Sequence, residues 1–266
     1  PFYHEQGLDP DTPAPLSIRA PFDATLCALV EELRPAVVSF HFGLPAPALL
    51  DRVTATGAKI IASATTVPEA RWLAARGVDA VIAQGAEAGG HRGMFLSGDV
   101  GTQIGTLSLV PQIVDAVDVP VIAAGGIADA RGIAAAAMLG ASAVQIGTAY
   151  LFCPEATIST PHREALAAGS ARETALTTVF TGRPARGVVN RVMRELGYLA
   201  PEAPAFPLAG GALAPLRAAT EPQGSGDFMP LWSGQSAGLG RVMPAAALTT
   251  TLAQEAAALL SRPAVP

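Results

Sequence analysis

The chain has 266 residues, half of them hydrophobic and 15% charged, so it can bury a substantial core. Its formal net charge of -5 and its lack of any basic run disfavour a nucleic-acid surface. The two cysteines, Cys27 and Cys153, lie far apart and outside any metal-ligand spacing, which indicates no disulfide framework and a reducing compartment. No signal-peptide pattern follows Pro1, and glycines and Pro154 interrupt the longest uncharged run, so we expect a cytoplasmic protein without a membrane span.

Short apolar runs alternate with amphipathic stretches from Asp23 onward. Asp23 is placed to cap the first helix, and Pro35 closes it. The expected strands are 36–40, 59–63, 79–83, 119–124 and 141–147. The expected helices are 23–33, one ending at 57, 67–76, 107–117, 129–139 and 245–260. This alternation predicts parallel βαβ units.

The regular spacing of these units is typical of a TIM (β/α)8 barrel or of a doubly wound sheet. Only five strands are recognisable, and residues 200–240 consist mostly of glycine, proline and alanine. We therefore expect a TIM (β/α)8 barrel that lacks its first three strands in this chain. Residues 1–200 would carry strands four to eight, and residues 201–266 a substrate-side loop segment and a C-terminal helix packing on the barrel. An open five-stranded sheet is the alternative.

A glycine-rich segment with one histidine follows the third strand, at Glu87-Ala88-Gly89-Gly90-His91-Arg92-Gly93. Glycine lets the backbone approach a ligand closely, and histidine transfers protons near neutral pH. Because α/β folds place chemistry in loops after parallel strands, His91 is a candidate catalytic residue. His41 also ends a strand and is a second candidate. The alternatives are a solvated histidine in an ordinary turn for His91 and a hydrogen-bonded structural histidine for His41.

Two glycine turns follow the last two strands, at Gly125-Gly126-Ile127 and at Gln145-Ile146-Gly147-Thr148. In barrels, loops at these places commonly bind phosphate through backbone N–H groups and a helix N-terminus, and Thr148 can add a hydroxyl donor. The alternative is that these glycines only permit tight turns. No dinucleotide-binding fingerprint or P-loop is present, and the four histidines are scattered, so we expect no metal site.

Five segments, in their order along the chain, resemble the nitronate monooxygenase family, once called 2-nitropropane dioxygenase, and its class I in particular. They are Ser39-Phe40-His41-Phe42-Gly43, residues 87–93, Ala123-Ala124-Gly125-Gly126-Ile127, residues 145–148 and Leu231-Trp232-Ser233-Gly234-Gln235. The resemblance covers residues 36–255 approximately. It implies an FMN-bearing TIM barrel that oxidises alkyl nitronates, such as propionate 3-nitronate, with dioxygen to a carbonyl compound and nitrite.

The resemblance also implies roles for single residues. His91 matches an active-site histidine near the flavin, His41 matches a second one, and Arg92 could join His41 in attracting a second carboxylate of the substrate. Phe206 stands where many members have a tyrosine. The expected partners are the nitronate and dioxygen, with a monomeric or homodimeric protein. The residues expected to contact FMN are Gln84, Gly89, Gly90, Gly125, Gly126, Gln145, Gly147, Thr148, Ser233 and Gln235.

Three other functions stay open at this point. An FMN-dependent NAD(P)H enoyl- or quinone reductase has a similar Ala-Gly-Gly-His loop and is the main alternative. The inosine-monophosphate dehydrogenase group shares the phosphate turns but needs a nucleophilic cysteine after a middle strand, whereas Cys153 follows the last one. A non-catalytic remnant that cannot take up FMN is the third.

Overall fold

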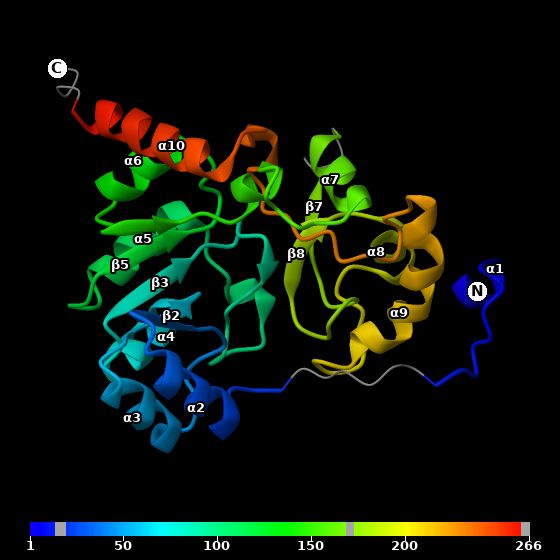
Figure 1. Cartoon of the computed structure of the whole chain (residues 1–266), viewed down its shortest axis with the longest axis horizontal. Helices are drawn as coiled ribbons and strands as arrows, with labels where there is room; N and C mark the ends of the chain where they lie inside the picture. The colour runs from blue at the N-terminus through cyan, green and yellow to red at the C-terminus, as the bar shows by residue number, and fades with distance from the viewer. Residues whose placement is uncertain (14–19, 169–172, 262–266) are drawn as a thin grey trace. The chain divides into compact units, whose positions relative to one another are not determined.

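The computed structural model describes residues 1–13, 20–168 and 173–261 (Figure 1). These residues form two compact units. The first, which we call the His91 unit, contains residues 1–13, 87–92, 146–168 and 173–255. The second, which we call the sheet unit, contains residues 20–86, 93–145 and 256–261.

Five parallel strands form the core of the sheet unit (Figure 1). They pair in the order β1-β2-β3-β5-β6, which is their order along the chain. All five expected strands and the parallel α/β class are therefore confirmed. The strands are β1 (Val37–Phe40), β2 (Lys59–Ala64), β3 (Ala80–Gln84), β5 (Val121–Ala124) and β6 (Ala143–Gln145).

The strand order of this sheet differs from that of a doubly wound sheet. A doubly wound sheet reverses its strand order at a switch point, and these five strands show no reversal. The central strand β3 is buried throughout, as its apolar sequence predicts. The outermost strands are more open, and Val37 of β1 is 50% exposed. The arrangement is thus a run of consecutively paired β/α units with two open edges.

Some helices of this unit begin at residues whose side chains cap them, as the sequence predicts. The carboxylate of Asp23 accepts a hydrogen bond from Leu26 N at 2.9 Å, and the hydroxyl of Thr66 accepts one from Glu69 N. The expected helices of this unit are confirmed, with ends one to a few residues earlier in several cases. They are α2 (Ala24–Leu33), α3 (Pro47–Ala55), α4 (Val67–Ala74), α5 (Thr106–Val114) and α6 (Ala130–Met138), beside the short η1 (Val100–Thr102).

The His91 unit contains a small antiparallel sheet in the order β4-β8-β7. Its strands are β4 (Gly90–His91), β7 (Thr174–Thr177) and β8 (Ala185–Val188). The sequence analysis missed all three, because β4 has two residues and the other two alternate poorly between polar and apolar. The unit's helical segments are α1 (Phe2–Glu5), η2 (Thr148–Phe152), α7 (Thr160–Ala167), α8 (Arg191–Leu196), α9 (Ala209–Thr220), η4 (Glu221–Gln223) and η5 (Ala237–Leu239).

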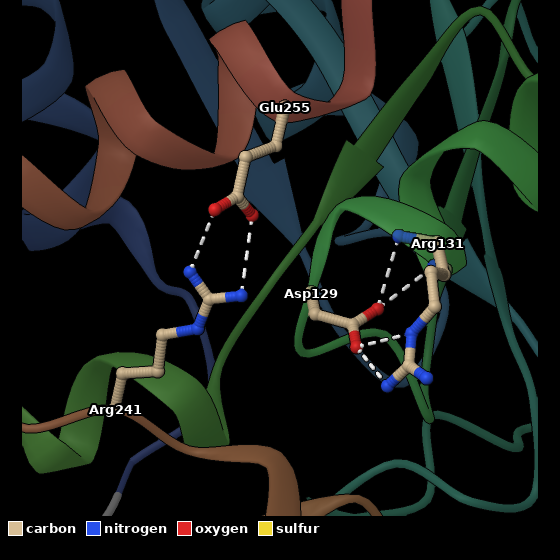
Figure 2. Close-up of polar contacts among 5 residues, drawn as sticks. Asp129, Arg131, Arg241 and Glu255 are labelled. Atoms are coloured by element: carbon tan, nitrogen blue, oxygen red, sulfur yellow. Dashed lines mark hydrogen bonds and ion pairs between the residues drawn. The ribbon is translucent and has the colours of Figure 1, made fainter. Parts of the chain in front are cut away.

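The core of the His91 unit packs around Phe180, Val192, Met193 and Phe228, all of them buried. The final helix α10 (Ala245–Leu260) has the bounds expected from the sequence. Within the His91 unit the guanidinium of Arg241 pairs with Glu255 of this helix, at 3.0 and 3.2 Å (Figure 2).

Among the helices of the described ranges, none is both long enough and apolar enough to cross a membrane.

Candidate functional site

The candidate catalytic histidine lies on a strand. Gly90 pairs with Arg186 and His91 with Ala185 of β8, and the next amide, Arg92 N, donates to Pro184 O at 2.9 Å. Gly90 has a φ of +73°, a left-handed angle that favours glycine. The glycine-rich segment is expected to be a loop, but Gly90 and His91 form the short strand β4. Pairing with β8 fixes the backbone of these two residues.

Three side chains surround the imidazole of His91. Nε2 lies 2.9 Å from the hydroxyl oxygen of Thr181. The ring centroid lies 5.8 Å from that of Phe206 in an edge-to-face arrangement and 5.6 Å from that of Trp232. Trp232 is itself braced by Phe180, edge-on at 5.6 Å. His91 is therefore oriented by a polar partner and aromatic contacts, which differs from a solvated histidine in an ordinary turn.

Residues 231–235, which we call the strap, run along β8 of the same unit. Val188 N donates to Leu231 O at 2.8 Å, and Trp232 forms an isolated bridge with Gly187. From Trp232 the strap continues toward the segment before His91, where Gln235 N donates to Glu87 O at 3.0 Å. The expected Trp-Ser-Gly-Gln element thus contacts residues 87–91, which we call the histidine segment.

The close approach of two glycines joins the strap to the histidine segment. A Cβ on Gly89 would lie 2.5 Å from Gly234 N, and one on Gly234 would lie 2.8 Å from Glu87 O. Gly234 N also donates to the hydroxyl of Thr148 at 2.9 Å. The buried Ser233 hydroxyl donates to Gly234 O at 3.1 Å. Three elements that are far apart in sequence therefore meet within the His91 unit.

Gly147 has no structural reason to be glycine. Its φ is -108°, an angle that residues with side chains adopt, and no atom lies within 4 Å of where its Cβ would be. Gly89 and Gly90, in contrast, are explained by the strap contact and by a positive φ. An open position with a bare backbone, next to the hydroxyl of Thr148, fits a ligand phosphate bound by main-chain and side-chain donors.

Three arginines belong to the segments that pack around His91. The guanidinium of Arg183 lies 5.6 Å from the Phe206 ring centroid, on a ring that also contacts His91. Arg92 and Arg186 are almost fully buried. Burial lowers the pKa of Arg183, and it lowers that of Arg186 against an opposing effect of Glu87. Such desolvated cations attract anions strongly.

A buried histidine of helix α7, His162, supports the strap. His162 of α7 is 9% exposed, and its Nε2 lies 3.0 Å from the carbonyl oxygen of Trp232. Burial lowers the pKa of His162, and the contact with Trp232 opposes that shift without cancelling it. A neutral imidazole that donates from Nε2 to this carbonyl satisfies both observations. His162 therefore acts as a packing and hydrogen-bonding support for the strap.

The sheet unit brings three other residues named above to one place. The amide oxygen of Gln84, at the end of β3, accepts a hydrogen bond from Gly93 N at 2.7 Å. A Cβ on Gly93 would lie 2.8 Å from Cε1 of His41, so this glycine permits the His41 ring to pack on the backbone. His41 also lies against Phe42, with ring centroids 4.5 Å apart. Gly93 is thereby fixed at the ends of β1 and β3.

The glycine turn after β5 adopts left-handed angles, with φ of +105° at Gly125 and +71° at Gly126. The hydroxyl of Thr106 donates to Gly125 O at 2.9 Å. On the next strand, Gln145 pairs with Ala124 and is exposed. The positive φ values account for both glycines of this turn, and phosphate binding by the turn stays a prediction.

The first amides of α6 are already occupied by a carboxylate of the chain. Asp129 accepts hydrogen bonds from Arg131 N at 3.0 Å and Gly132 N at 3.2 Å, and it pairs with the Arg131 guanidinium (Figure 2). Burial alone would raise the pKa of Asp129, but the contacts with Arg131 and Gly132 lower it overall. A phosphate near this turn would therefore be bound by turn amides and not by the α6 N-terminus.

The sequence analysis missed two residues with organising roles. Thr181 lies in the turn between β7 and β8. The glycine and proline of Thr181-Gly182-Arg183-Pro184, flanked by segments that contain threonine and valine, are the sequence signal for this turn. Glu69, 1% exposed, accepts hydrogen bonds from the backbone N–H groups of Phe95 and Leu96, and Thr66-x-x-Glu69 is its capping-box signal. In the part of the chain that the structure describes, no cluster of three or more His, Cys, Asp or Glu residues is suited to a metal.

Comparisons with known proteins extend over most of the chain. The family model described as Nitronate monooxygenase matches residues 12–255. A nitronate monooxygenase of Pseudomonas aeruginosa is 46% identical over 234 residues, which are 88% of this chain and 67% of that protein. The solved structure of a nitroalkane oxidase from Streptomyces ansochromogenes is 41% identical with a TM-score of 0.85, over 97% of this chain and 74% of that one.

A second solved structure is less similar. FabK from Thermotoga maritima is 31% identical with a TM-score of 0.75, and the match covers 91% of this chain and 75% of the FabK chain. Identity and TM-score are both lower than for the nitroalkane oxidase. The similarity to the nitroalkane oxidase structure is thus the stronger of the two.

Proposed function

This chain belongs to the nitronate monooxygenase family, and from that premise we propose that it oxidises alkyl nitronates with dioxygen to a carbonyl compound and nitrite. One observation of the structure carries the proposal beyond the family. His91, which contacts Thr181, Phe206 and Trp232, lies in the same unit as Thr148 and the strap, which we expect to contact the cofactor.

FMN is the proposed cofactor, and the His91 unit has groups that fit its phosphate. The bare backbone at Gly147 leaves room for an anion, and the Thr148 hydroxyl accepts from Gly234 N while keeping its own proton to donate. When bound, FMN would supply the electron-transfer chemistry that the side chains lack. The other predicted FMN contacts of the two units, among them Gln84, Gly126 and Gln145, stay proposals.

His91 is the proposed catalytic residue. As an imidazolium it would stabilise the anionic nitronate, and as a neutral imidazole it would remove a proton from a nitroalkane. Arg183, whose guanidinium lies over the Phe206 ring, would add positive potential near this ring. Phe206 limits the space beside His91 and brings no hydroxyl group to a substrate. His41 and Arg92 stay candidates for binding a second carboxylate of the substrate.

We further propose that the sheet is part of a TIM barrel. Its strands pair in chain order without a reversal, as consecutive barrel strands do, and its outer strands are open. Five strands of a (β/α)8 barrel leave three to be supplied. The chain spans about two thirds of the length of the Pseudomonas aeruginosa relative. This share is close to five strands out of eight.

Anaerobic mixing of the FMN-loaded protein with a nitronate or with NADH tests the function. We expect propyl-1-nitronate to reduce the flavin within seconds, NADH to leave it oxidised, and readmitted oxygen to yield nitrite. Replacing His91 with asparagine should lower turnover at least tenfold, or about 1.4 kcal/mol in the activation barrier, while FMN stays bound. Stopped-flow absorbance and a nitrite assay provide the readouts.

Flavin bleaching by NADH, with no response to nitronates, would instead indicate an enoyl- or quinone reductase. A protein that takes up no FMN at all would favour a non-catalytic remnant. Unchanged nitronate turnover in His91→Asn would contradict the catalytic role of His91.

A further inference from the structure

We propose that Thr181 is a positioning residue for His91, bound to Nε2 in both protonation states of the imidazole. The inference rests on the proposed function, in which His91 meets the substrate. Thr181 is 8% exposed, and its hydroxyl oxygen is 2.9 Å from Nε2. The same oxygen accepts from Arg183 N at 3.3 Å and lies 3.2 Å from Arg183 O, to which it can donate.

A hydroxyl group has a single proton, and this fixes the two arrangements at Thr181. When Nε2 of His91 has no proton, the hydroxyl donates to it. When Nε2 is protonated, it donates to the hydroxyl oxygen, which turns its own proton to the Arg183 carbonyl oxygen. The heavy atoms keep their places in both arrangements. A carbonyl or carboxylate partner would accept only from the protonated nitrogen, so the hydroxyl suits a ring that gains and loses a proton.

The aromatic neighbours alone do not select one orientation of the His91 ring. Phe206 and Trp232 confine the plane of the imidazole by packing at 5.8 and 5.6 Å. Packing distinguishes poorly between the two ring orientations that exchange nitrogen and carbon positions, because their shapes are nearly equal. A directional hydrogen bond to Nε2 selects one of them. Thr181 therefore supplies the orientation and the aromatic rings supply the confinement.

The test compares Thr181→Val, which removes the hydroxyl, with Thr181→Ser, which keeps it. Thr178→Val is the matched control, because Thr178 lies in the same turn and its hydroxyl contacts Ala200 O instead of His91. Nitrogen-15 spectra of the histidine rings report the protonation of each nitrogen, and the spectrum of His91→Asn assigns the signals. We expect Thr181→Val to shift the His91 signals and to lower nitronate kcat about tenfold, with FMN affinity within about twofold.

Thr181→Ser and Thr178→Val should both resemble the unchanged protein in spectrum and in kcat. Wild-type signals and turnover in Thr181→Val would overturn the proposal. So would an equal loss in Thr181→Ser, because the hydroxyl would then be irrelevant, or an equal loss in Thr178→Val, because the effect would belong to the turn. If the unchanged protein oxidises no nitronate, the proposed function fails, and the nitrogen-15 comparison still decides whether Thr181 orients His91.

Discussion

The glycines of the two expected phosphate turns differ in why each is a glycine. Gly125 and Gly126 have positive φ values, which explain them without any ligand. Gly147 has neither a positive φ nor a neighbour within 4 Å of its absent Cβ. It is the position where a ligand offers the best reason for a bare backbone.

Replacing Gly147 with alanine should weaken FMN binding at least tenfold, because the new methyl group occupies the space we assign to the phosphate. The free energy of unfolding of the protein without cofactor should change by less than about 0.5 kcal/mol, as for most surface substitutions. Gly98→Ala is the matched control, since Gly98 also has open space and no positive φ. Fluorescence titration of FMN into each variant measures the affinity. Equal FMN affinity in both variants would contradict the assignment.

The sequence marks His91, Gly147 and Thr148 as candidate site residues because each lies in a recognisable short motif after a strand. It does not reveal Thr181, whose partner His91 is 90 residues away along the chain. The two meet only through the pairing of β4 with β8, which has a two-residue strand on one side. Local patterns cannot predict a contact that depends on such a pairing.

At the scale of elements, Glu69 links helix α4 to the segment that follows His91. One carboxylate oxygen accepts from Thr65 N and from the Thr65 hydroxyl, both at 2.7 Å. The other accepts from Phe95 N at 2.6 Å and Leu96 N at 3.1 Å. Four donors point at one buried carboxylate, so an amide cannot replace it without turning an NH2 group toward donors.

Glu69→Gln should therefore lower the free energy of unfolding by roughly 1–3 kcal/mol, the cost of a buried group left without its partner. Urea unfolding followed by circular dichroism measures the change. Glu32→Gln, at an exposed position of α2, is the control and should remain within about 0.5 kcal/mol of the unchanged protein. Equal unfolding midpoints for both variants would show that the four hydrogen bonds contribute little.

Elements with local signals were predictable, and those without them were not. Asp23 and Asp129 cap helices that the sequence indicated, and β3 is a continuous apolar run. The strands β7 and β8 carry threonines, Arg186 and Gly187, and they acquire their form only by pairing with each other and with β4. Their stability comes from partners distant in sequence, which composition does not show.

At the scale of the whole molecule, both edges of the five-stranded sheet are open. Val37 on β1 is 50% exposed, and β6 alternates between exposed and half-buried residues. Nearby apolar side chains are exposed too, with Leu33 of α2 at 67% and Met138 of α6 at 80%. Natural sheets protect such edges, so these are the places where further β/α units would pair.

Adding a polypeptide with the part of the Pseudomonas aeruginosa relative that has no counterpart in this chain should protect both edges. Amide hydrogen exchange in β1 and β6 should slow by at least tenfold, because pairing removes these amides from solvent. Exchange in the central strand β3 should stay unchanged and serves as the internal control. Unchanged exchange in β1 and β6 despite a soluble added segment would argue against the barrel.

The contact between Gly89 and Gly234 limits how this protein can be redesigned. Because a Cβ on Gly89 would meet Gly234 N and a Cβ on Gly234 would meet Glu87 O, a side chain at either position would push the strap away from the histidine segment. A library that randomises the strap to accept bulkier nitro compounds should therefore keep this pair constant. Diversity is better directed to Phe206, whose ring faces His91 from a segment that neither glycine constrains.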